Sequence, residues 1–364
     1  MTSSGAHGSD ALFQPHRGAV RGAVYGLAAA MLFGISAPVS KMLLSDLPPL
    51  LLAALLYLGA GVALLVVTPF APREKRNEAP LRRSDLPLLA GIVLTGGILG
   101  PYLMLVGLQR VSGLAGSLLL NLEAPFTMIV ALLFFGEHLA RREALAGALI
   151  VGGGLTLAWM PGEFNAHWVG ALSIAGACLS WALDNNWTQR LALKDPFAVV
   201  RIKTLGAGIC SLVLALALGQ WITSIRATAA ALVVGVFSYG ISILLDAYAL
   251  RHVGAAREAA FFATAPFIGA VVAIPLLHER PTSLEVTGML AMAAGVAALL
   301  RVRHTHFHTH EAMEHEHVHV HDDHHDHPHE ADAGVGERHS HIHTHAPFIH
   351  DHPHVSDAHH RHHH

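Results

Sequence analysis

The sequence predicts an all-α membrane protein: ten transmembrane helices as two inverted five-helix repeats, plus a disordered tail. Three observations carry this prediction. Of the 364 residues, 52% are hydrophobic and only 13% are charged, whereas about 25% of the residues in a soluble protein are charged. Apolar runs of the ~20 residues that cross a bilayer recur along the chain. A motif from the first half also returns in the second half.

The repeated motif lies in the apolar segment 117–137, which carries one carboxylate, Glu123, near its middle. Residues 121–126 read NLEAPF, and residues 262–267 read FATAPF. In both copies an apolar run follows and ends near an acidic residue, Glu137 in the first copy and Glu279 in the second. The two separations differ by one residue, which indicates a diverged repeat.

The chain divides into four parts. Residues 1–20 are polar and predicted to be a disordered cytoplasmic segment. The apolar run that follows has the length of a span and no clear cleavage site after it, so it is interpreted as the first transmembrane helix and not as a cleavable signal peptide. The first repeat is expected at 21–160, the second at 168–302, and the His-rich tail at 303–364. The predicted spans are 22–43, 49–70, 87–107, 114–135, 144–160, 168–188, 197–219, 228–250, 257–277 and 284–302.

The distribution of Lys and Arg between the loops predicts the orientation. Loops on one side hold fifteen of these residues, from Arg17 to Arg303, and loops on the other side hold four: Lys41, Arg110, Arg226 and Arg280. The rule that cytoplasmic loops are positive places both termini in the cytoplasm of an inner or plasma membrane protein. Five spans per repeat make the second repeat enter the membrane inverted, which is typical of secondary transporters.

Short motifs occur at matching places in the two halves. They are 34–38 followed by Lys41, 107–112, 123–125 and 136–137 in the first half, and 249–254, 264–266 and Glu279 in the second. Together these motifs resemble the EamA family of the drug/metabolite transporter superfamily, and the likeness covers about 20–303. The resemblance implies a ten-helix inverted-repeat carrier of small organic solutes, often an exporter, with its substrate left open.

Charged side chains at bilayer depth are costly and usually face a cavity or a partner. Glu123 lies about ten residues into the fourth span, where a carboxylate is a candidate proton carrier. The alternative is a packing role, with a hydrogen bond to a neighbour such as Asn121. Tyr102 and Tyr239 lie within spans and are candidates for the cavity wall, with core or interface packing as the alternative.

A second polar group is predicted where the sixth and seventh spans meet. Asp184 is expected to pair with Lys203 or with Arg201, and Asn185 and Asn186 add hydrogen-bond donors and acceptors. The group is interpreted either as an inner gate and polar wall of the site or as an interfacial anchor, with the basic side chains extending to lipid headgroups.

The tail holds 24 of the 30 histidines and has too little apolar surface to form a core, which predicts disorder. Neutral imidazole binds Zn, Ni, Co or Cu, so the tail is expected to capture metal at several flexible sites. A pH-responsive polycation is the alternative. The predicted metal ligands are His304, His306, His308, His310, His315, His317, His319, His321, His324, His325, His327 and His329.

The leading functional hypothesis is a proton-coupled or facilitated exporter of a small organic metabolite, with the tail as a metal sensor or buffer. The alternative is a Ni, Co or Zn exporter whose tail collects the metal, although the spans show no constellation of metal ligands. A storage protein anchored by its spans is a third reading, for which ten helices are excessive. No enzymatic nucleophile, required cofactor, ATP-binding loop or nucleic-acid module is found. The expected partners are a small-molecule substrate, the lipid bilayer and divalent metal ions, and a homodimer is left open.

Overall fold

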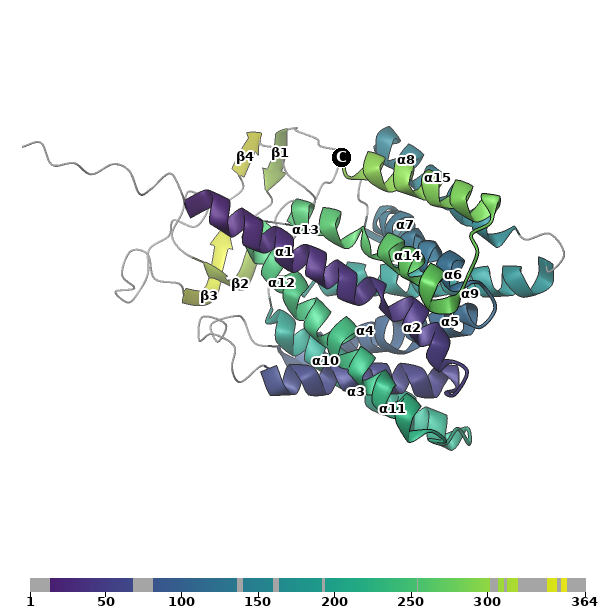
Figure 1. The fold of residues 1–364 in the computed structure, drawn as a ribbon. Helices are drawn as coiled ribbons and strands as arrows, with labels where there is room; N and C mark the ends of the chain where they lie inside the picture. The colour runs from purple at the N-terminus through teal and green to yellow at the C-terminus, as the bar shows by residue number, and fades with distance from the viewer. Residues whose placement is uncertain are drawn as a thin grey trace, which may run out of the picture.

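The computed structural model describes residues 14–67, 81–135, 140–159, 164–191, 194–253, 255–301, 307–310, 313–319, 339–345 and 348–351. Within these ranges the chain up to residue 299 is helical, and strands occur after it (Figure 1). The predicted all-α membrane part is therefore confirmed. Most of the predicted N-terminal segment, Glu137, and seven of the predicted metal ligands lie outside the described residues, the seven ligands being His304, His306, His321, His324, His325, His327 and His329.

The first repeat contains eight helices that make five spans, because several spans are broken near their middle. Two of the breaks are short turns, a π-helical turn over Val93–Leu99 and a 3-10 turn over Leu120–Leu122. The helices are α1 (Gln14–Gly34), α2 (Ser36–Leu43), α3 (Pro49–Val67), α4 (Leu86–Ile92), α5 (Gly100–Leu108), α6 (Gly113–Leu119), α7 (Glu123–Phe135) and α8 (Arg141–Ala158).

The second repeat contains seven helices that make the remaining five spans. A π-helical turn over Gly235–Ile241 again interrupts its third span, and a break at 263–264 interrupts its fourth. The helices are α9 (Phe164–Gln189), α10 (Pro196–Ala217), α11 (Ile225–Val234), α12 (Ser242–Val253), α13 (Ala255–Phe262), α14 (Ala265–Leu277) and α15 (Ser283–Leu299).

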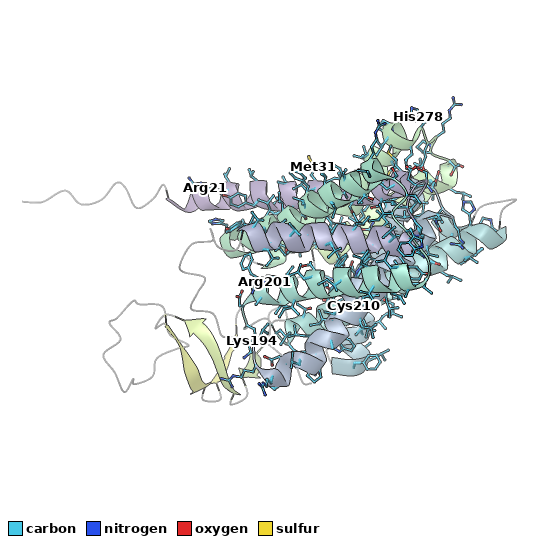
Figure 2. The ribbon with its side chains drawn as sticks, turned by 90° about the horizontal axis from the view of Figure 1, so that it is seen from below. Arg21, Met31, Lys194, Arg201, Cys210 and His278 are labelled. Carbon is cyan, nitrogen blue, oxygen red and sulfur yellow. The ribbon has the colours of Figure 1, made fainter. Side chains whose placement is uncertain are left out.

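Helices occupy all ten of the predicted ranges. Among the described residues, seven helical stretches are long and apolar enough to cross a membrane, and Ser283–Leu299 is a shorter apolar helix. The helices α8 and α9 lie at the predicted fifth and sixth spans. Arg21, Lys194 and Arg201 lie at one end of the bundle and His278 at the other (Figure 2). These two ends are called the basic end and the His278 end below.

The inverted relation between the repeats is visible in their packing. Residues 58–61 and 205–208 both read Leu-Gly-Ala-Gly, in α3 and α10, the second span of each repeat. Gly61 packs against Leu205, and Gly208 packs against Leu58. Each glycine thus receives the leucine of the other copy, as a two-fold relation requires, and the missing side chain lets the helix backbones approach closely.

The last span of each repeat shows the same reciprocity. Gly153 of α8 packs against Met292 of α15, and Gly295 of α15 packs against Ile150 of α8. Both helices begin with a glutamate three residues after the capping position. Glu143 accepts a hydrogen bond from the Ala140 N–H at 2.8 Å, and Glu285 accepts one from the Thr282 N–H at 2.9 Å. Such caps satisfy N–H groups that the first helical turn leaves without partners.

Four short segments of the tail are β-strands, whereas the sequence predicts disorder there. These are β1 (Phe307–His310), β2 (Met313–His319), β3 (His339–His345) and β4 (Phe348–Asp351). β1 pairs with β4 and β2 pairs with β3, both antiparallel, so the strands make two separate two-stranded ribbons. Histidines alternate here with residues such as Thr, Val and Ile that favour strands, a pattern that matches the two-residue period of a strand.

Candidate functional site

The two π-helical turns occupy the third span of each repeat. A π turn shifts the helical hydrogen bonds by one residue and frees backbone groups for other partners. In the first repeat the carbonyl of Gly96 accepts hydrogen bonds from the Tyr57 hydroxyl at 2.8 Å and from the Trp181 indole N–H at 3.1 Å. This carbonyl therefore ties α3 of the first repeat to α9 of the second.

An ion pair lies beside this carbonyl. Lys203 of α10 donates to the carboxylate of Asp184 on α9, and the two side chains are 21% and 3% exposed. Thr188, one turn further along α9, donates to the same carboxylate at 3.4 Å. Any side chain at Gly96 would clash with the carboxylate of Asp184. Of the two partners that the sequence suggests for Asp184, the structure pairs it with Lys203, while Arg201 is half-buried at the basic end (Figure 2).

A second polar contact joins the two repeats. The side-chain amide of Asn185 on α9 donates to the carboxylate of Glu123 at the start of α7, at 2.6 Å. Asn185 is exposed and Glu123 is half-buried, so neither group is sealed inside the protein. Asn121, which the sequence offered as an example of a neighbouring partner under the packing alternative, instead directs its amide within the 3-10 turn to the Leu118 carbonyl at 2.9 Å.

The remaining predicted site residues divide between the core and the surface. Asn186 is buried and donates to the Ala182 carbonyl at 2.8 Å, a bond within its own helix. Tyr239 lies in the second π-helical turn and is buried against Phe33 and Tyr57, with ring centroids 5.7 Å away in both cases. Tyr102 is 37% exposed on α5. The structure thus gathers an aromatic layer near the charged pair, and sequence reasoning missed Tyr57 and Phe33 in it.

A network at the His278 end was not predicted as a site, although its residues carry the repeated motifs. The ammonium group of Lys41 on α2 donates to the carbonyls of Leu108 and Val111, both at 2.6 Å. These carbonyls belong to the end of α5 and the turn after it, where the helix provides no partners. Lys41 therefore fixes the turn between the third and fourth spans.

The second repeat holds the same turn from the other side. Glu279 accepts hydrogen bonds from the N–H groups of Gly113 at 2.5 Å and Leu114 at 2.8 Å, at the start of α6. A carboxylate is favoured there by the unpaired N–H groups and the helix dipole. The Ser112 hydroxyl donates to Glu285 at 2.6 Å. Glu279 and Glu285 thus close the His278 end across the two repeats, and we call these two residues with Lys41 and Ser112 the cross-repeat clamp.

The fourth and ninth spans meet only in part. Near the clamp α6 packs on α14, where Gly113 contacts Leu277 and Gly269 contacts Ser117. Toward the basic end α7 packs on α9, and α13 packs on α1 and α12. The breaks in these spans therefore separate a half in which the two spans pack on each other from a half in which each span packs on other helices.

A carboxyl pair lies on α12 and α13 in the second repeat. The two residues are Asp246 on α12 and Glu258 on α13, and both side chains are half-buried.

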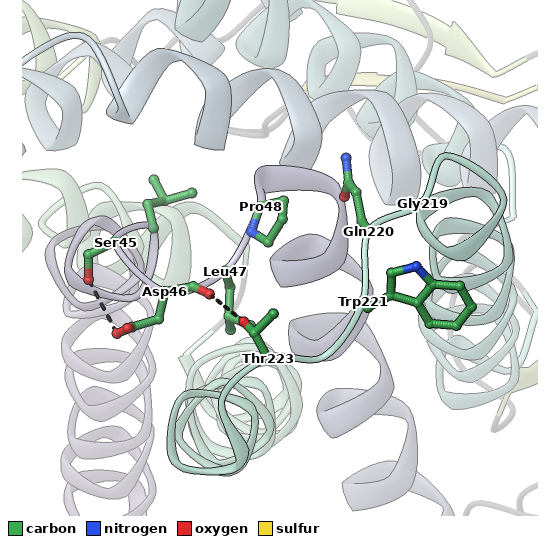
Figure 3. A pocket seen from close by; sticks show the side chains of 9 residues that line it. Ser45, Asp46, Leu47, Pro48, Gly219, Gln220, Trp221 and Thr223 are labelled. Carbon is green, nitrogen blue, oxygen red and sulfur yellow. Dashed lines mark hydrogen bonds between the residues drawn. The ribbon is translucent and has the colours of Figure 1, made fainter.

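A pocket of about 500 Å³ opens at the His278 end between two loops (Figure 3). One loop spans 44–48 in the first repeat and the other spans 219–223 in the second. The Thr223 hydroxyl donates to the backbone carbonyl of Asp46 at 3.4 Å. This pocket shares no residue with the charged pair or with the contact between Glu123 and Asn185.

Two inverted repeats with charged side chains paired between their spans define a multi-pass membrane transporter. The model of the EamA-like transporter family matches residues 20–159 and 168–301. The chain belongs to this family.

Similar proteins agree with this class. An uncharacterized transporter from Methanothermobacter thermautotrophicus is 29% identical over 78% of this chain and 89% of its own length. A probable amino-acid metabolite efflux pump from Salmonella typhimurium is 29% identical over 74% of this chain and 91% of its own length. One solved crystal structure shares the fold with a TM-score of 0.54 and 17% identity, over 76% of this chain and 96% of that one.

Proposed function

We propose that this chain is a secondary transporter that exports a small organic metabolite by alternating access. The observation that carries the proposal is the polar group inside the spans. The carboxylate of Glu123 in the first repeat meets Asn185 of the second, next in sequence to the ion pair of Asp184 with Lys203. Substrate sites in inverted-repeat carriers lie between the repeats near the middle of the membrane.

The charges favour a solute that carries both signs. Glu123 offers a carboxylate to a substrate ammonium group, and Lys203 offers an ammonium group to a substrate carboxylate. Tyr57 and Tyr239 supply an aromatic wall. Two relatives carry matching names, the Salmonella efflux pump and a probable terminal-alkyne amino-acid exporter from Streptantibioticus cattleyicolor, 25% identical over 66% of this chain. An amino-acid-like metabolite is the substrate class that these observations support.

The direction of access follows from the two ends of the bundle. The excess of Lys and Arg in the loops of the basic end supports a cytoplasmic position for that end. The cross-repeat clamp closes the opposite end, where the solute would leave. Export then requires Glu279 and Glu285 to release the start of α6, while α7 and α13 close toward each other at the basic end.

Counterflow into proteoliposomes tests the proposal. Liposomes with the full chain are loaded with unlabelled neutral amino acids and related zwitterions, and uptake of the labelled solute is measured. We expect saturable counterflow that falls at least ~100-fold in Glu123→Gln, because the carboxylate that would bind the ammonium group is lost. Glu143→Gln is the matched control, since Glu143 only caps a helix at the basic end, and it should transport like the wild type.

The same preparation distinguishes the second hypothesis. Saturable flux of Ni²⁺, Co²⁺ or Zn²⁺ without counterflow of any organic solute would overturn the proposal and favour a metal exporter. Equal loss of counterflow in both variants would remove Glu123 from the substrate path. The His-rich tail is proposed to bind divalent metal as a regulatory or buffering segment, independently of the solute path.

A further inference from the structure

The last spans of the two repeats, α8 and α15, pack on each other at one edge of the bundle (Figure 1). Gly295 of α15 packs against Ile150 and against the carbonyl of Ala146 in α8, while Gly153 of α8 packs against Met292 of α15. Residue numbers rise along one helix as they fall along the other, so the two helices are antiparallel. The end of α15 therefore lies beside the start of α8, at the basic end.

Arginines from both repeats meet at this place. Arg301 continues the last turn of α15, because its N–H donates to the Ala298 carbonyl at 3.2 Å. The rise per residue is the same in both helices, so extending the register from Gly295 to Arg301 brings Arg301 to the height of Arg142. Arg141 precedes Arg142 in the first turn of α8, and all three arginines are exposed.

The three guanidinium groups keep their charge available for a ligand. Within the described part of the chain, none of them forms an ion pair or a side-chain hydrogen bond. The next residue along α8, Glu143, directs its carboxylate to a backbone N–H at the start of its own helix, at 2.8 Å. This surface is therefore positive, and a negatively charged partner would complement it.

An apolar surface continues from the arginines toward the middle of the membrane. On the outer side of the contact between the two helices, α8 presents Leu145, Leu149 and Gly152, and α15 presents Ala294 and Ala298, all of them exposed. We call these five residues the outer seam. A methyl group added at Gly152 would meet nothing within 4 Å, so the seam has room along α8.

We propose that the end of the α8 and α15 pair binds an anionic phospholipid, with its phosphate on Arg142 and Arg301 and an acyl chain along the outer seam. A guanidinium group binds phosphate oxygens through two parallel hydrogen bonds. Basic groups between membrane helices are suited to anionic headgroups, and the apolar seam below them suits the attached chain. The site rests on membrane insertion alone and requires nothing of the transport function.

A second copy of the chain is the other occupant that an apolar seam could take. In a dimer with its two-fold axis along the membrane normal, Arg142 and Arg301 of both copies would lie at the same depth. Like charges brought together in this way repel each other. Charge complementarity therefore favours the lipid over the second copy.

Lipid titration of the full-length protein in detergent tests the proposal. Native mass spectrometry measures the binding of phosphatidylglycerol to the wild type and to Arg142→Gln with Arg301→Gln. We expect the tightest lipid site to weaken at least ~10-fold in this double variant, because both groups that hold the phosphate are lost. Unchanged binding would overturn the proposal.

A control variant removes the same charge from the same end of the bundle. Arg21→Gln with Arg83→Gln changes two exposed arginines, one on α1 and one just before α4. The tightest site should stay within ~2-fold of the wild type, because neither side chain belongs to the α8 and α15 pair. Equal weakening in both double variants would mean that total positive charge attracts the lipid, and the proposal would fail. Both variants should unfold at the wild-type temperature without lipid, which excludes misfolding as the cause.

Three further ligands and one variant separate the possible occupants. Phosphatidylcholine with the same acyl chains should bind at least ~10-fold more weakly than phosphatidylglycerol, because its headgroup has no net charge. Glycerol phosphate and inorganic phosphate should not compete, because neither has a chain to fill the outer seam. Equal binding of phosphatidylcholine, or competition by either soluble phosphate, would overturn the proposal. A lipid-free dimer that Gly152→Leu disrupts would assign the seam to a second copy and would overturn it too.

Discussion

The first two spans of each repeat can be compared residue by residue, because 58–61 and 205–208 align without a gap back to the preceding helix. In the second repeat Asp184 and Lys203 form an ion pair. The corresponding positions in the first repeat are Ala37 and Leu56, which are 1% and 0% exposed. The chain has therefore kept the small residues that pack the repeats together and has placed this ion pair in the second repeat only.

This difference separates two demands on an inverted repeat. Packing across the two-fold relation works only if both copies provide a small residue for the other copy's side chain. A solute site needs no such symmetry, and each charge at bilayer depth is costly unless it is paired. An ion pair at two positions that are apolar in the other repeat is therefore what a transport site inside a symmetric scaffold would require.

Removing one member of the ion pair should have the largest effect. Asp184→Ala leaves the ammonium group of Lys203 without its partner, which is expected to cost about 3–5 kcal/mol of stability and to abolish counterflow. The double variant Asp184→Ala with Lys203→Leu copies the first repeat. We expect it to recover most of the stability, because an apolar pair can replace a buried ion pair, while counterflow stays absent. Thermal unfolding of the purified protein and counterflow measure the two effects separately.

Two results would contradict this interpretation of the ion pair. A double variant that transports like the wild type would show that the charges serve packing alone. A double variant that is no more stable than Asp184→Ala would show that the two positions are not energetically coupled.

Weakening the cross-repeat clamp should open the His278 end of the bundle. Glu279→Gln leaves one acceptor oxygen for two N–H groups, and the loss of a hydrogen bond to a charged group costs about 1.5–3 kcal/mol. The state closed at the His278 end should become roughly 10-fold to 100-fold less favoured. Labelling of Ser117→Cys by an impermeant thiol reagent, with Cys178 and Cys210 replaced, should then accelerate, because Ser117 is buried between α6 and α14.

A matched variant sharpens that measurement. Arg110→Gln lies on the same turn, and its side chain bonds only the Val106 carbonyl of its own helix among the described contacts. It should leave the labelling rate unchanged. Equal acceleration in both variants would mean that any change in this turn opens the His278 end, and the role of Glu279 would be lost.

Much of the fold follows from the sequence because its determinants are local. Apolar length predicts the spans, loop charge predicts their alternation, the repeated 121–126 motif predicts the duplication, and five spans per copy predict the inversion. The pairing of Asp184 with one of two basic residues was predictable for the same reason, since the short loop between α9 and α10 brings their ends together.

The rest of the site depends on contacts that the sequence does not encode locally. The partner of Glu123 is Asn185, 62 residues away, while Asn121, two residues before Glu123, bonds the Leu118 carbonyl in a 3-10 turn. The clamp joins Ser112 to Glu285 across 173 residues. The π-helical turns could have been suspected only from glycine-rich stretches at matching places in the third and eighth spans.

The smallest expected effects concern the symmetric packing itself. A methyl group at Gly208 would meet the backbone nitrogen of Leu58 at 2.9 Å, whereas one at Gly61 would meet chiefly the flexible end of Leu205. A backbone atom cannot move aside as a side-chain end can, so Gly208→Ala should cost about 1–3 kcal/mol and Gly61→Ala less. Gly152→Ala is the control, because nothing lies within 4 Å of its added methyl group. It should be neutral or slightly stabilising through helix propensity. Thermal unfolding of the three variants ranks them, and a Gly61→Ala variant as damaging as Gly208→Ala would mean that Leu205 is held as rigidly as the backbone it faces.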